Sequence, residues 1–337
     1  NDELARIVET SDEWIYSHTG IRYRHIAAEH ESASDLAVPA AQQAIERAGL
    51  VPNDIDLVLL ATSTPDYVGL PSTACVVQDR LGIKDAGAMD VMAACSGFVY
   101  GMETARVYVE AGAATNVLLV GAEVYSKIVN WEDRRSCVLF GDGAGAVVIG
   151  TGEAGTSSRS DEARPPGNGA APGGGSATGT NEYDARILPA ILGSQGSGAE
   201  SLYRSHGGTR NAYVPGETPE AELKLKMDGR KVYNFAVTSM GFVIRELLSR
   251  NDLEFTDLER VVPHQANERI ISAAAKREGW DPTMFHVNIA EYANTSAASI
   301  PIALNEMFEG GQLRRGGLYA TVGFGSGLTY GGNLFYF

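Results

Sequence analysis

The chain has 337 residues, of which 44% are apolar and 20% are charged, a composition typical of globular proteins. No run of about 18 uncharged apolar residues occurs, so we expect no membrane-spanning segment. The 42 acidic and 27 basic residues give a net charge of −15. This balance argues against a nucleic-acid-binding protein, because such proteins concentrate positive charge on one face.

The cysteine pattern indicates an intracellular protein. Cys75, Cys95 and Cys137 are an odd number and have no CxxC spacing, so we expect neither a disulfide framework nor a zinc site. No cluster of His, Cys, Asp and Glu has the spacing of metal ligands, and no metal is expected. No signal peptide opens the chain, and the expected compartment is the cytoplasm.

The first part of the chain alternates helical and strand patterns. A helix is predicted over 34–49, followed by a buried strand over 55–62. Small residues within 93–102 begin a second helix, which leads to a strand over 116–123. Gly141-Asp-Gly-Ala-Gly precedes a strand rather than a helix, so it predicts a closely packed backbone turn and not a phosphate site.

Residues 152–182 are rich in Gly, Ala, Ser and Pro and hold no large aliphatic side chain. Burial of this segment cannot offset its ordering entropy, so it is predicted to be a surface loop. After it, a helix is predicted over 232–250, a strand within 257–265, a helix start within 294–304 and a strand over 318–325. The second part thus repeats the order of the first.

Strands that alternate with helices predict an α/β fold with parallel-rich sheets covered on both faces. The repeat divides the chain into an N-terminal half, 1–151, and a C-terminal half, 183–337. We expect the active site where the two halves meet.

Cys95 is the first candidate for chemistry. It lies where an apolar run meets small residues and a helix begins. The positive end of a helix dipole lowers the pKa of a nearby thiol and favours the nucleophilic thiolate. The alternative is that Cys95 is a small buried hydrophobic residue, as free cysteine commonly is, and this alternative is favoured for Cys75 and Cys137.

His264 and Asn294 are the next candidates. His264 follows a predicted buried strand, and ligands bind at the carboxyl ends of strands in α/β sheets. It can donate hydrogen bonds to a negative oxygen or act as an acid or base. Asn294 occupies the segment that corresponds to Cys95 in the repeat, although Asn is also a common helix N-cap. Gly323-Phe-Gly-Ser-Gly predicts a tight turn that aims N–H groups into the site.

Taken together, the sequence resembles the β-ketoacyl-acyl-carrier-protein synthase III family of the thiolase superfamily, over nearly the whole chain outside 152–182. The matching stretches are TSDEWIYSHTGIRYRHIA (10–27), AACSGF (93–98), LFGDGAGAVV (139–148), VPHQANERIISAAAKR (262–277), NTSAASIPIAL (294–304) and GFGSGLTYGG (323–332). The resemblance implies a thiolase-like five-layered αβαβα fold, two duplicated halves and a homodimer. It also implies a leading strand, and since this chain starts inside the family pattern, that first strand is expected to be missing.

The resemblance implies a Cys-His-Asn triad of Cys95, His264 and Asn294. The implied reaction is the decarboxylating Claisen condensation of a short acyl-CoA with malonyl-acyl-carrier protein, which initiates type II fatty-acid synthesis without a resident cofactor. The N–H groups of Cys95 and Ser326 are implied to form an oxyanion hole, and Phe324 is implied to shield the site from water.

Further positions follow from the resemblance alone. Trp14 and Arg134 match the pair that sandwiches the CoA adenine, and Thr19 and Asn267 match other positions of the CoA tunnel. Basic residues that match the docking patch for the acidic carrier protein are Arg269, Lys276 and Arg277. Leu70 lies where an aromatic residue of the partner subunit often closes the acyl pocket, and a flexible aliphatic side chain there predicts tolerance of longer or branched primers.

Two alternatives stay open. The first is a related condensing enzyme of secondary metabolism. A hydroxymethylglutaryl-CoA synthase is disfavoured, since Glu103 and Glu123 lie in no motif that matches its catalytic glutamate. The second is a non-catalytic homologue that serves as a binding subunit, which the intact Cys-His-Asn set argues against.

Overall fold

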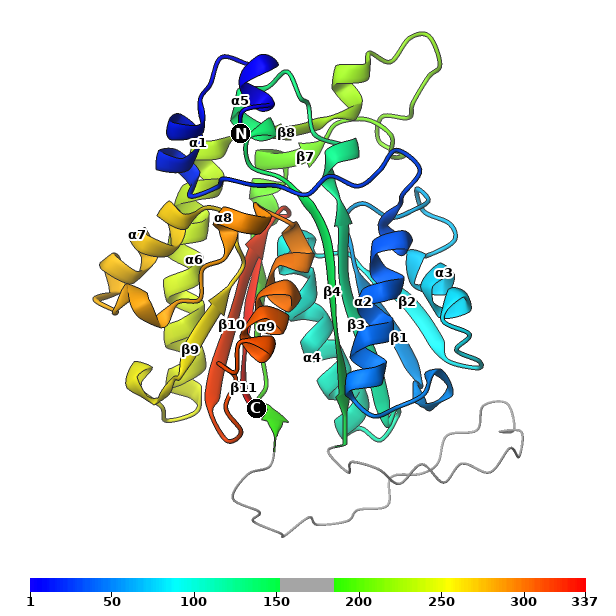
Figure 1. Cartoon of the computed structure of the whole chain (residues 1–337), viewed down its shortest axis with the longest axis vertical. Coiled ribbons are helices and arrows are strands. Elements are labelled where there is room, and N and C mark those ends of the chain that lie inside the picture. Colours follow the sequence, from blue (N-terminus) through cyan, green and yellow to red (C-terminus); the bar gives the residue numbers. More distant parts are fainter. Residues whose placement is uncertain (152–184) are drawn as a thin grey trace.

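The computed structural model describes residues 1–151 and 185–337. Within these ranges two sheets stand side by side, with helices between them and on both outer faces (Figure 1). The predicted surface loop 152–182 lies outside the described residues.

The first sheet belongs to the N-terminal half and has the strand order β2-β1-β3-β4. β1 pairs in parallel with β2 and β3, and β4 is antiparallel to β3. The two central strands are almost fully apolar and buried, as expected for a parallel sheet covered on both faces. The bounds are β1 Leu57–Ala61, β2 Gly87–Val91, β3 Asn116–Val124 and β4 Asp142–Gly150.

The second sheet belongs to the C-terminal half and has the order β5-β11-β10-β9, with β6 also paired to β11. β9 and β10 are parallel, and β11 runs antiparallel to β10. A small ribbon of β7 and β8 lies near the top of the molecule in Figure 1. The bounds are β5 Arg186–Ile187, β6 Ile191–Ser194, β7 Leu202–Arg204, β8 Leu225–Met227, β9 Arg260–Pro263, β10 Leu318–Gly325 and β11 Thr329–Tyr336.

Helices form the three remaining layers. α4 and α9 pack between the sheets through side chains such as Phe98 and Met307. α2 and α3 cover the outer face of the first sheet, and α6 and α7 cover that of the second. This is the predicted five-layered αβαβα order. The bounds are α1 Asp12–Thr19, α2 Ala33–Arg47, α3 Thr73–Arg80, α4 Gly97–Glu110, α5 Arg134–Cys137, α6 Gly229–Arg250, α7 Glu268–Glu278, α8 Ile289–Tyr292 and α9 Ser299–Glu309.

The prediction of turns at the two glycine clusters is wrong for most of their length. Gly143 and Gly145 lie inside β4, and Gly323 and Gly325 lie inside β10. The expectation of close packing is correct, since a Cβ added at Gly145 would lie 2.8 Å from the backbone N of Ile302 in α9. Glycine is needed here so that a strand and a helix can approach closely.

The two halves differ at one sheet edge. The outer edge of β11 is paired with β5 and β6, whereas β4 pairs only with β3 among the described residues. The N–H of Asp142 points outward to the carbonyl of His25, at 2.8 Å. Because directions alternate along a strand, the N–H groups of Ala144 and Ala146 point the same way, and they have no hydrogen bond to a described residue.

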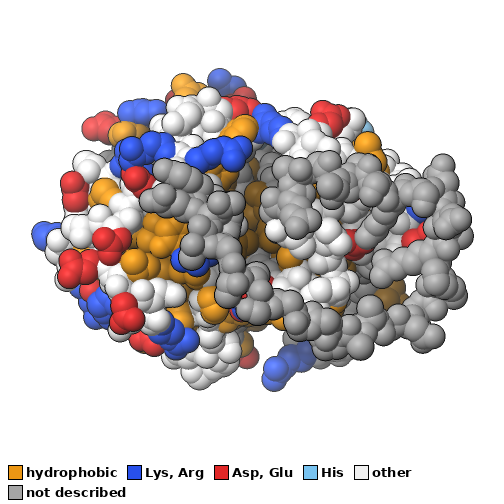
Figure 2. Space-filling view, turned by 90° about the horizontal axis from the view of Figure 1, so that it is seen from below, with side chains coloured by type: hydrophobic (Ala, Val, Ile, Leu, Met, Phe, Trp, Pro, Cys, Tyr) orange, Lys and Arg blue, Asp and Glu red, His pale blue; other side chains and the backbone are white. Residues whose placement is uncertain are grey.

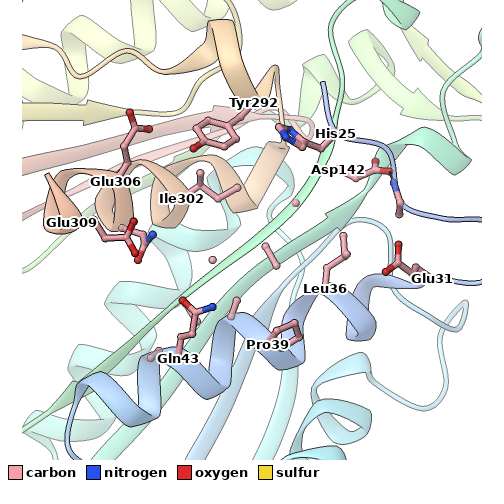
Figure 3. Close-up of a pocket in the computed structure, with 18 of the residues that line it drawn as sticks. His25, Glu31, Leu36, Pro39, Gln43, Asp142, Tyr292, Ile302, Glu306 and Glu309 are labelled. Atoms are coloured by element: carbon pink, nitrogen blue, oxygen red, sulfur yellow. Dashed lines mark hydrogen bonds between the residues drawn. The ribbon is translucent and has the colours of Figure 1, made fainter. Parts of the chain in front are cut away.

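A groove of about 540 Å³ runs along this open edge between α2 and α9. Figure 3 shows Leu36 and Pro39 of α2 on one side and Ile302 and Glu306 of α9 on the other. None of the predicted site residues lines it.

Charged and apolar side chains are mixed on the part of the surface that can be seen in Figure 2. On the face viewed in Figure 2, the described residues present acidic and basic side chains interspersed with apolar ones, without a broad basic area. Among the residues described, no helix has both the length and the apolar character that a membrane crossing requires.

Candidate active site

One cavity brings most of the predicted site residues together. It has a volume of about 240 Å³ and lies at the carboxyl ends of the parallel strands, where α/β proteins bind ligands. The predicted residues that line it are Trp14, Thr19, Cys95, Arg134, His264, Asn267, Asn294 and Phe324. The structure therefore unites residues from both halves, as predicted for a site at their junction.

Cys95 follows β2, in a short 3-10 turn, Ala94–Ser96, that leads into α4. Ala94 adopts a positive φ of 48°, a conformation that costs a non-glycine residue about 1 kcal/mol or more. The corresponding turn before α9, Ser296–Ala298, begins with Ser296 at a φ of 50°. The same strained turn thus precedes both central helices, and in the first half it presents Cys95.

The pKa of Cys95 differs from the sequence-based expectation. The helix start predicts a lowered value, but the side chain is only 3% exposed, and burial raises the thiol pKa to about 12. The hydroxyl of Ser296 acts in the opposite direction. Desolvation of the charged thiolate outweighs the favourable dipole, so the free protein holds Cys95 as a thiol.

His264 follows β9 and is 1% exposed. Its Nδ1 lies 2.7 Å from the Ser299 hydroxyl at the start of α9. If that hydroxyl donates to Nδ1, Nε2 carries the proton, which is the tautomer needed to donate into the cavity. Burial lowers the pKa of His264 to about 3, so the imidazole is neutral at physiological pH.

Asn294 lies in the loop before α9 and is 5% exposed. Its Oδ1 accepts a hydrogen bond from the N–H of Ser296 at 2.9 Å. This local bond uses the acceptor and leaves Nδ2, a donor, without a hydrogen bond to the described residues. The Asn side chain is therefore more than a helix cap: it offers the cavity an oriented N–H group.

The end of β10 forms the wall beside Cys95. Phe324 is 3% exposed and meets the His264 ring edge-on, with centroids 5.4 Å apart. A Cβ added at Gly325 would lie only 2.7 Å from the Cys95 N, so only glycine fits there. Ser326 follows, half-buried, and its hydroxyl donates to the carbonyl of Leu202. Ser326 does not itself line the cavity.

Trp14 lines the cavity and has two close neighbouring side chains. His18 stacks on it at 4.4 Å, and the Arg134 guanidinium lies 4.8 Å from its ring centroid. For an adenine ring to fit between them, the Trp14 ring and the Arg134 guanidinium must be about 7 Å apart, which is twice a normal contact distance. The predicted pair is present, but Arg134 must move aside for such a ring to enter.

Thr19 and Asn267 make local bonds as well as lining the cavity. The Thr19 hydroxyl donates to the carbonyl of Ile15, at 2.6 Å. Asn267 caps α7 by accepting from the N–H of Arg269 and donates to the carbonyl of His18. These bonds connect the end of α1 to the start of α7 and fix the rim of the cavity.

The comparisons with known proteins agree with this geometry. The model of the 3-oxoacyl-[acyl-carrier-protein] synthase III family matches residues 89–162, and the model of its C-terminal part matches residues 248–337. A β-ketoacyl-[acyl-carrier-protein] synthase III of Clostridioides difficile is 44% identical over 335 residues, covering 99% of this chain and 92% of its own. The chain belongs to the 3-oxoacyl-acyl-carrier-protein synthase III family.

Solved structures support the same conclusion. The synthase III of Aquifex aeolicus superposes with a TM-score of 0.83 at 39% identity, covering 100% of this chain and 94% of its own. The priming β-ketosynthase of the R1128 polyketide pathway superposes with a TM-score of 0.82 at 33% identity, covering 100% of this chain and 91% of its own. This member of the synthase III family is thus a thiolase-like condensing enzyme, an acyltransferase of the initiating step in fatty-acid synthesis.

The remaining predicted residues of this synthase III lie on the surface. Arg269, Lys276 and Arg277 are exposed along α7, with Arg269 bonded to the carbonyl of Ser17 near the cavity rim. Arg277 donates to the hydroxyl of Thr238 in α6, and the neighbouring Glu278 pairs with Arg245 of the same helix. Leu70 is 88% exposed and does not line the cavity of its own chain.

Three residues around the triad were not predicted from the sequence. Ser299 bonds to His264, and Ser296 bonds to Asn294 and lies next to Cys95. Glu123 is fully buried at the end of β3, close to both Cys95 and Ser296. The stretch NTSAAS contains both serines, but only the three-dimensional packing gives each a partner.

Proposed function

We propose that this synthase III joins a short acyl group from CoA to the malonyl group of malonyl-acyl-carrier protein, with loss of CO2, to start type II fatty-acid synthesis. One observation carries the proposal: a thiol, a neutral imidazole and a free amide N–H line one cavity, which Trp14 lines as well. A panel of acyl-CoAs tested with malonyl-acyl-carrier protein checks it. Formation of β-ketoacyl-carrier protein supports the proposal, and no product with any acyl-CoA overturns it.

In the first half-reaction, Cys95 attacks the acyl thioester and keeps the acyl group, while CoA leaves as a thiolate. This covalent step divides one difficult reaction into two. We assign the oxyanion that forms to the N–H groups of Cys95 and Ser326. Gly325 supports this assignment because it lets the end of β10 approach the Cys95 N. Loss of one such hydrogen-bond donor typically lowers the catalytic rate about 100-fold or more.

In the second half-reaction, the malonyl thioester loses CO2 and leaves an enolate. We assign stabilisation of the enolate oxygen to His264 Nε2–H and Asn294 Nδ2–H. Neutral donors suit this task because they stabilise charge without transferring a proton. The carbanion then attacks the acyl-Cys95 carbonyl, and the thiolate leaves. Phe324 shields this step from water, and the chemistry requires no resident metal or cofactor.

The basic face of α7 is proposed to dock the carrier protein. In a chain of net charge −15, three exposed cations on one helix are suited to steer an acidic partner. CoA is proposed to bind in the cavity, with its adenine stacked on Trp14 beside Arg134, and with Thr19 and Asn267 along its path. The proposed compartment is the cytoplasm.

Lys276→Glu tests the docking face. Lys276 is exposed and has no bond to a described residue. Reversal of one surface charge weakens the binding free energy of a charged partner by about 1 kcal/mol. We therefore expect the KM for malonyl-carrier protein to rise about fivefold at low salt. The KM for malonyl-CoA, measured as the control, should not change. An equal rise for both substrates, or none for the carrier protein, contradicts this role.

We also propose that the protein is a homodimer. β2 is an edge strand of the first sheet, and the neighbouring apolar side chains Val68, Leu70 and Met92 are 79%, 88% and 72% exposed. Asp90 of β2 accepts the N–H groups of Thr73 and Ala74, which holds this loop against the strand. An exposed apolar group of this kind marks an interaction site, and in the dimer Leu70 would reach the partner's acyl pocket.

Leu70→Phe tests that placement through primer choice. A leucine side chain can change rotamer, whereas a flat ring forms a stiff wall. The parent is expected to accept acetyl-CoA and also four- or five-carbon and branched primers. The substitution should raise the kcat/KM ratio of acetyl-CoA to isobutyryl-CoA about 10-fold or more. An unchanged ratio means that Leu70 does not line the pocket.

A second candidate is a priming condensing enzyme of secondary metabolism. The 33% identity to the R1128 priming ketosynthase favours it over a non-catalytic binding subunit. The fatty-acid and secondary-metabolism enzymes differ in the carrier protein that they serve. Kinetics with the fatty-acid carrier protein and with a polyketide carrier protein of the same host distinguish them, and a higher kcat/KM with the former supports the proposed function.

A further inference from the structure

A pair of hydroxyl groups next to Cys95 has no part in the proposed mechanism. Ser96 is 0% exposed, and its Oγ lies 2.7 Å from Oγ1 of Thr329. Neither residue lines the substrate cavity. Ser96 belongs to the turn before α4 in the N-terminal half, whereas Thr329 begins β11 in the C-terminal half. The pair therefore connects the two halves of the chain beside the proposed nucleophile.

The simplest alternative role for Ser96 is to cap α4, since serine is a common N-cap. Ser96 does occupy the N-cap position, but its side chain accepts no hydrogen bond from an N–H group of that helix. Its Oγ instead lies 2.8 Å from the carbonyl of Ala93 and 2.7 Å from Thr329 Oγ1. The hydroxyl group is thus directed to the turn and to the other half of the chain rather than to the helix.

Thr329 extends the contact to Ser326. Its Oγ1 lies 2.9 Å from the Ser326 carbonyl and 3.0 Å from the Ala93 carbonyl. The Ala93 carbonyl already accepts the N–H of Ser96, at 3.2 Å. Because each hydroxyl has one proton to donate, every group is satisfied when Ser96 donates to Thr329 and Thr329 donates to the Ser326 carbonyl. A continuous hydrogen-bonded path then runs from the residue after Cys95 to Ser326.

The path joins the two segments whose N–H groups the proposed function assigns to the oxyanion. Neither the N–H of Cys95 nor that of Ser326 donates to another described residue, so both are free donors. A Cβ added at Gly325 would lie 2.7 Å from Cys95 N, and one added at Gly323 would lie 3.0 Å from the Cα of Ser96. The glycines let the two segments approach, but they have no side chain that could fix the separation.

We propose that the hydroxyl pair of Ser96 and Thr329 sets the separation of the two oxyanion donors. The inference deepens the proposed function and rests on it, because the pair has this role only if Cys95 attacks a thioester carbonyl. Ser96 and Thr329 act through their neighbours and touch no substrate, so they are positioning residues. Donors that are held in place before the reaction stabilise an oxyanion without reorganisation, and a displacement of about 1 Å can slow a reaction about 100-fold.

The hydroxyl pair should affect only the steps in which a tetrahedral oxyanion forms. Attack of Cys95 on acetyl-CoA makes such an oxyanion, so acylation depends on the donor separation. Alkylation of Cys95 by iodoacetamide forms an S–C bond and expels iodide without an oxyanion. Decarboxylation of malonyl thioester makes an enolate, which the proposed function assigns to His264 and Asn294. These two reactions therefore report separately on the thiol and on the rest of the cavity.

Thr329→Val tests the inference, since valine keeps the shape of threonine and removes the hydroxyl. We expect the rate of Cys95 acylation at saturating acetyl-CoA, followed by intact mass, to fall about 10-fold or more. The acetyl-CoA concentration at half-saturation should stay within about twofold of the parent, because the oxyanion exists only in the transition state and the intermediate. Alkylation by iodoacetamide and malonyl decarboxylation should each stay within about twofold as well.

Further variants test the path itself. Ser96→Ala should slow acylation as Thr329→Val does, and the double variant should be no slower than the slower single one, because both remove the same link. Thr329→Ser keeps the hydroxyl and should restore acylation to within about threefold of the parent. Thr321→Val is the matched control: the Thr321 hydroxyl also bridges β10 and β11, to Asn333 Oδ1 at 3.3 Å, but lies outside the cavity. Its loss should leave acylation unchanged.

Acylation that stays within about twofold of the parent in Thr329→Val or in Ser96→Ala overturns the inference. An equal loss of acylation and alkylation also overturns it, because that result indicates a disturbed thiol rather than displaced donors. The same loss of acylation in Thr321→Val has the same consequence. If the parent itself forms no acyl-Cys95, the proposed function fails, and the inference with it. A parent that is acylated beside unaffected variants rejects the positioning role alone.

Discussion

Cys95→Ala is expected to abolish formation of the acyl-enzyme. The thiol is the group to which the proposed mechanism attaches the acyl chain, and no other side chain of the cavity can form a thioester. Without it the covalent route is lost, so condensation should fall by about 1,000-fold or more, as for removal of a nucleophile from a catalytic set. Intact mass after incubation with acetyl-CoA should show no added acyl group.

The substitution should leave the fold intact. Cys95 is 3% exposed, and alanine removes one sulfur atom without adding bulk, a change that costs about 1 kcal/mol. The thermal unfolding midpoint, measured in parallel, is the control. Malonyl decarboxylation, which needs no thiol, should continue. An acyl adduct that persists on the variant, or one found on exposed Cys75 in the parent, contradicts the assignment.

His264→Ala and Asn294→Ala are expected to depress decarboxylation far more than acyl transfer. Both donors serve the enolate oxygen, which forms only after malonyl binds. Loss of one donor in a dry site should slow decarboxylation about 100-fold or more, while transfer from CoA to Cys95 should change less than about fivefold. Rates of CO2 release and of acyl-enzyme formation, measured separately, give the two values.

Ser299→Ala is the matched control for this division of labour. Ser299 holds Nδ1 of His264 but does not line the cavity, so its loss should slow decarboxylation by a smaller factor. Equal losses in the two half-reactions would indicate a shared structural role for His264 and Asn294. Because burial holds the His264 pKa at about 3, the decarboxylation rate should also show no inflection between about pH 5 and 8, where an ordinary histidine titrates near 6.5.

Much of the layer order could be predicted from the sequence because two local patterns recur along it. Apolar runs such as 116–123 have the length and composition of buried strands, and small-residue helix starts precede both central helices. Glycines are harder to place. A glycine in a strand and a glycine in a turn look alike in sequence, and only the approach of Ile302 to Gly145 explains why β4 needs one.

The candidate site could be predicted as a set of residues but not as an electrostatic environment. Proximity to a helix start favours a lowered Cys95 pKa, and the opposing effect of burial cannot be judged from one segment. The buried carboxyl of Glu123 and the hydroxyl of Ser296 come from distant segments, and nothing local in the sequence marks their approach to Cys95. Likewise, the closed gap between Trp14 and Arg134 depends on side-chain positions that no motif encodes.

The most direct test of the proposed mechanism is a single intact-mass experiment on the parent protein mixed with acetyl-CoA and then with malonyl-carrier protein. In the first stage we expect an acetyl group on the peptide that contains Cys95. In the second stage we expect loss of that group and the appearance of acetoacetyl-carrier protein with release of CO2. A protein that stays unacylated, or product that forms without the Cys95 adduct, would contradict the mechanism.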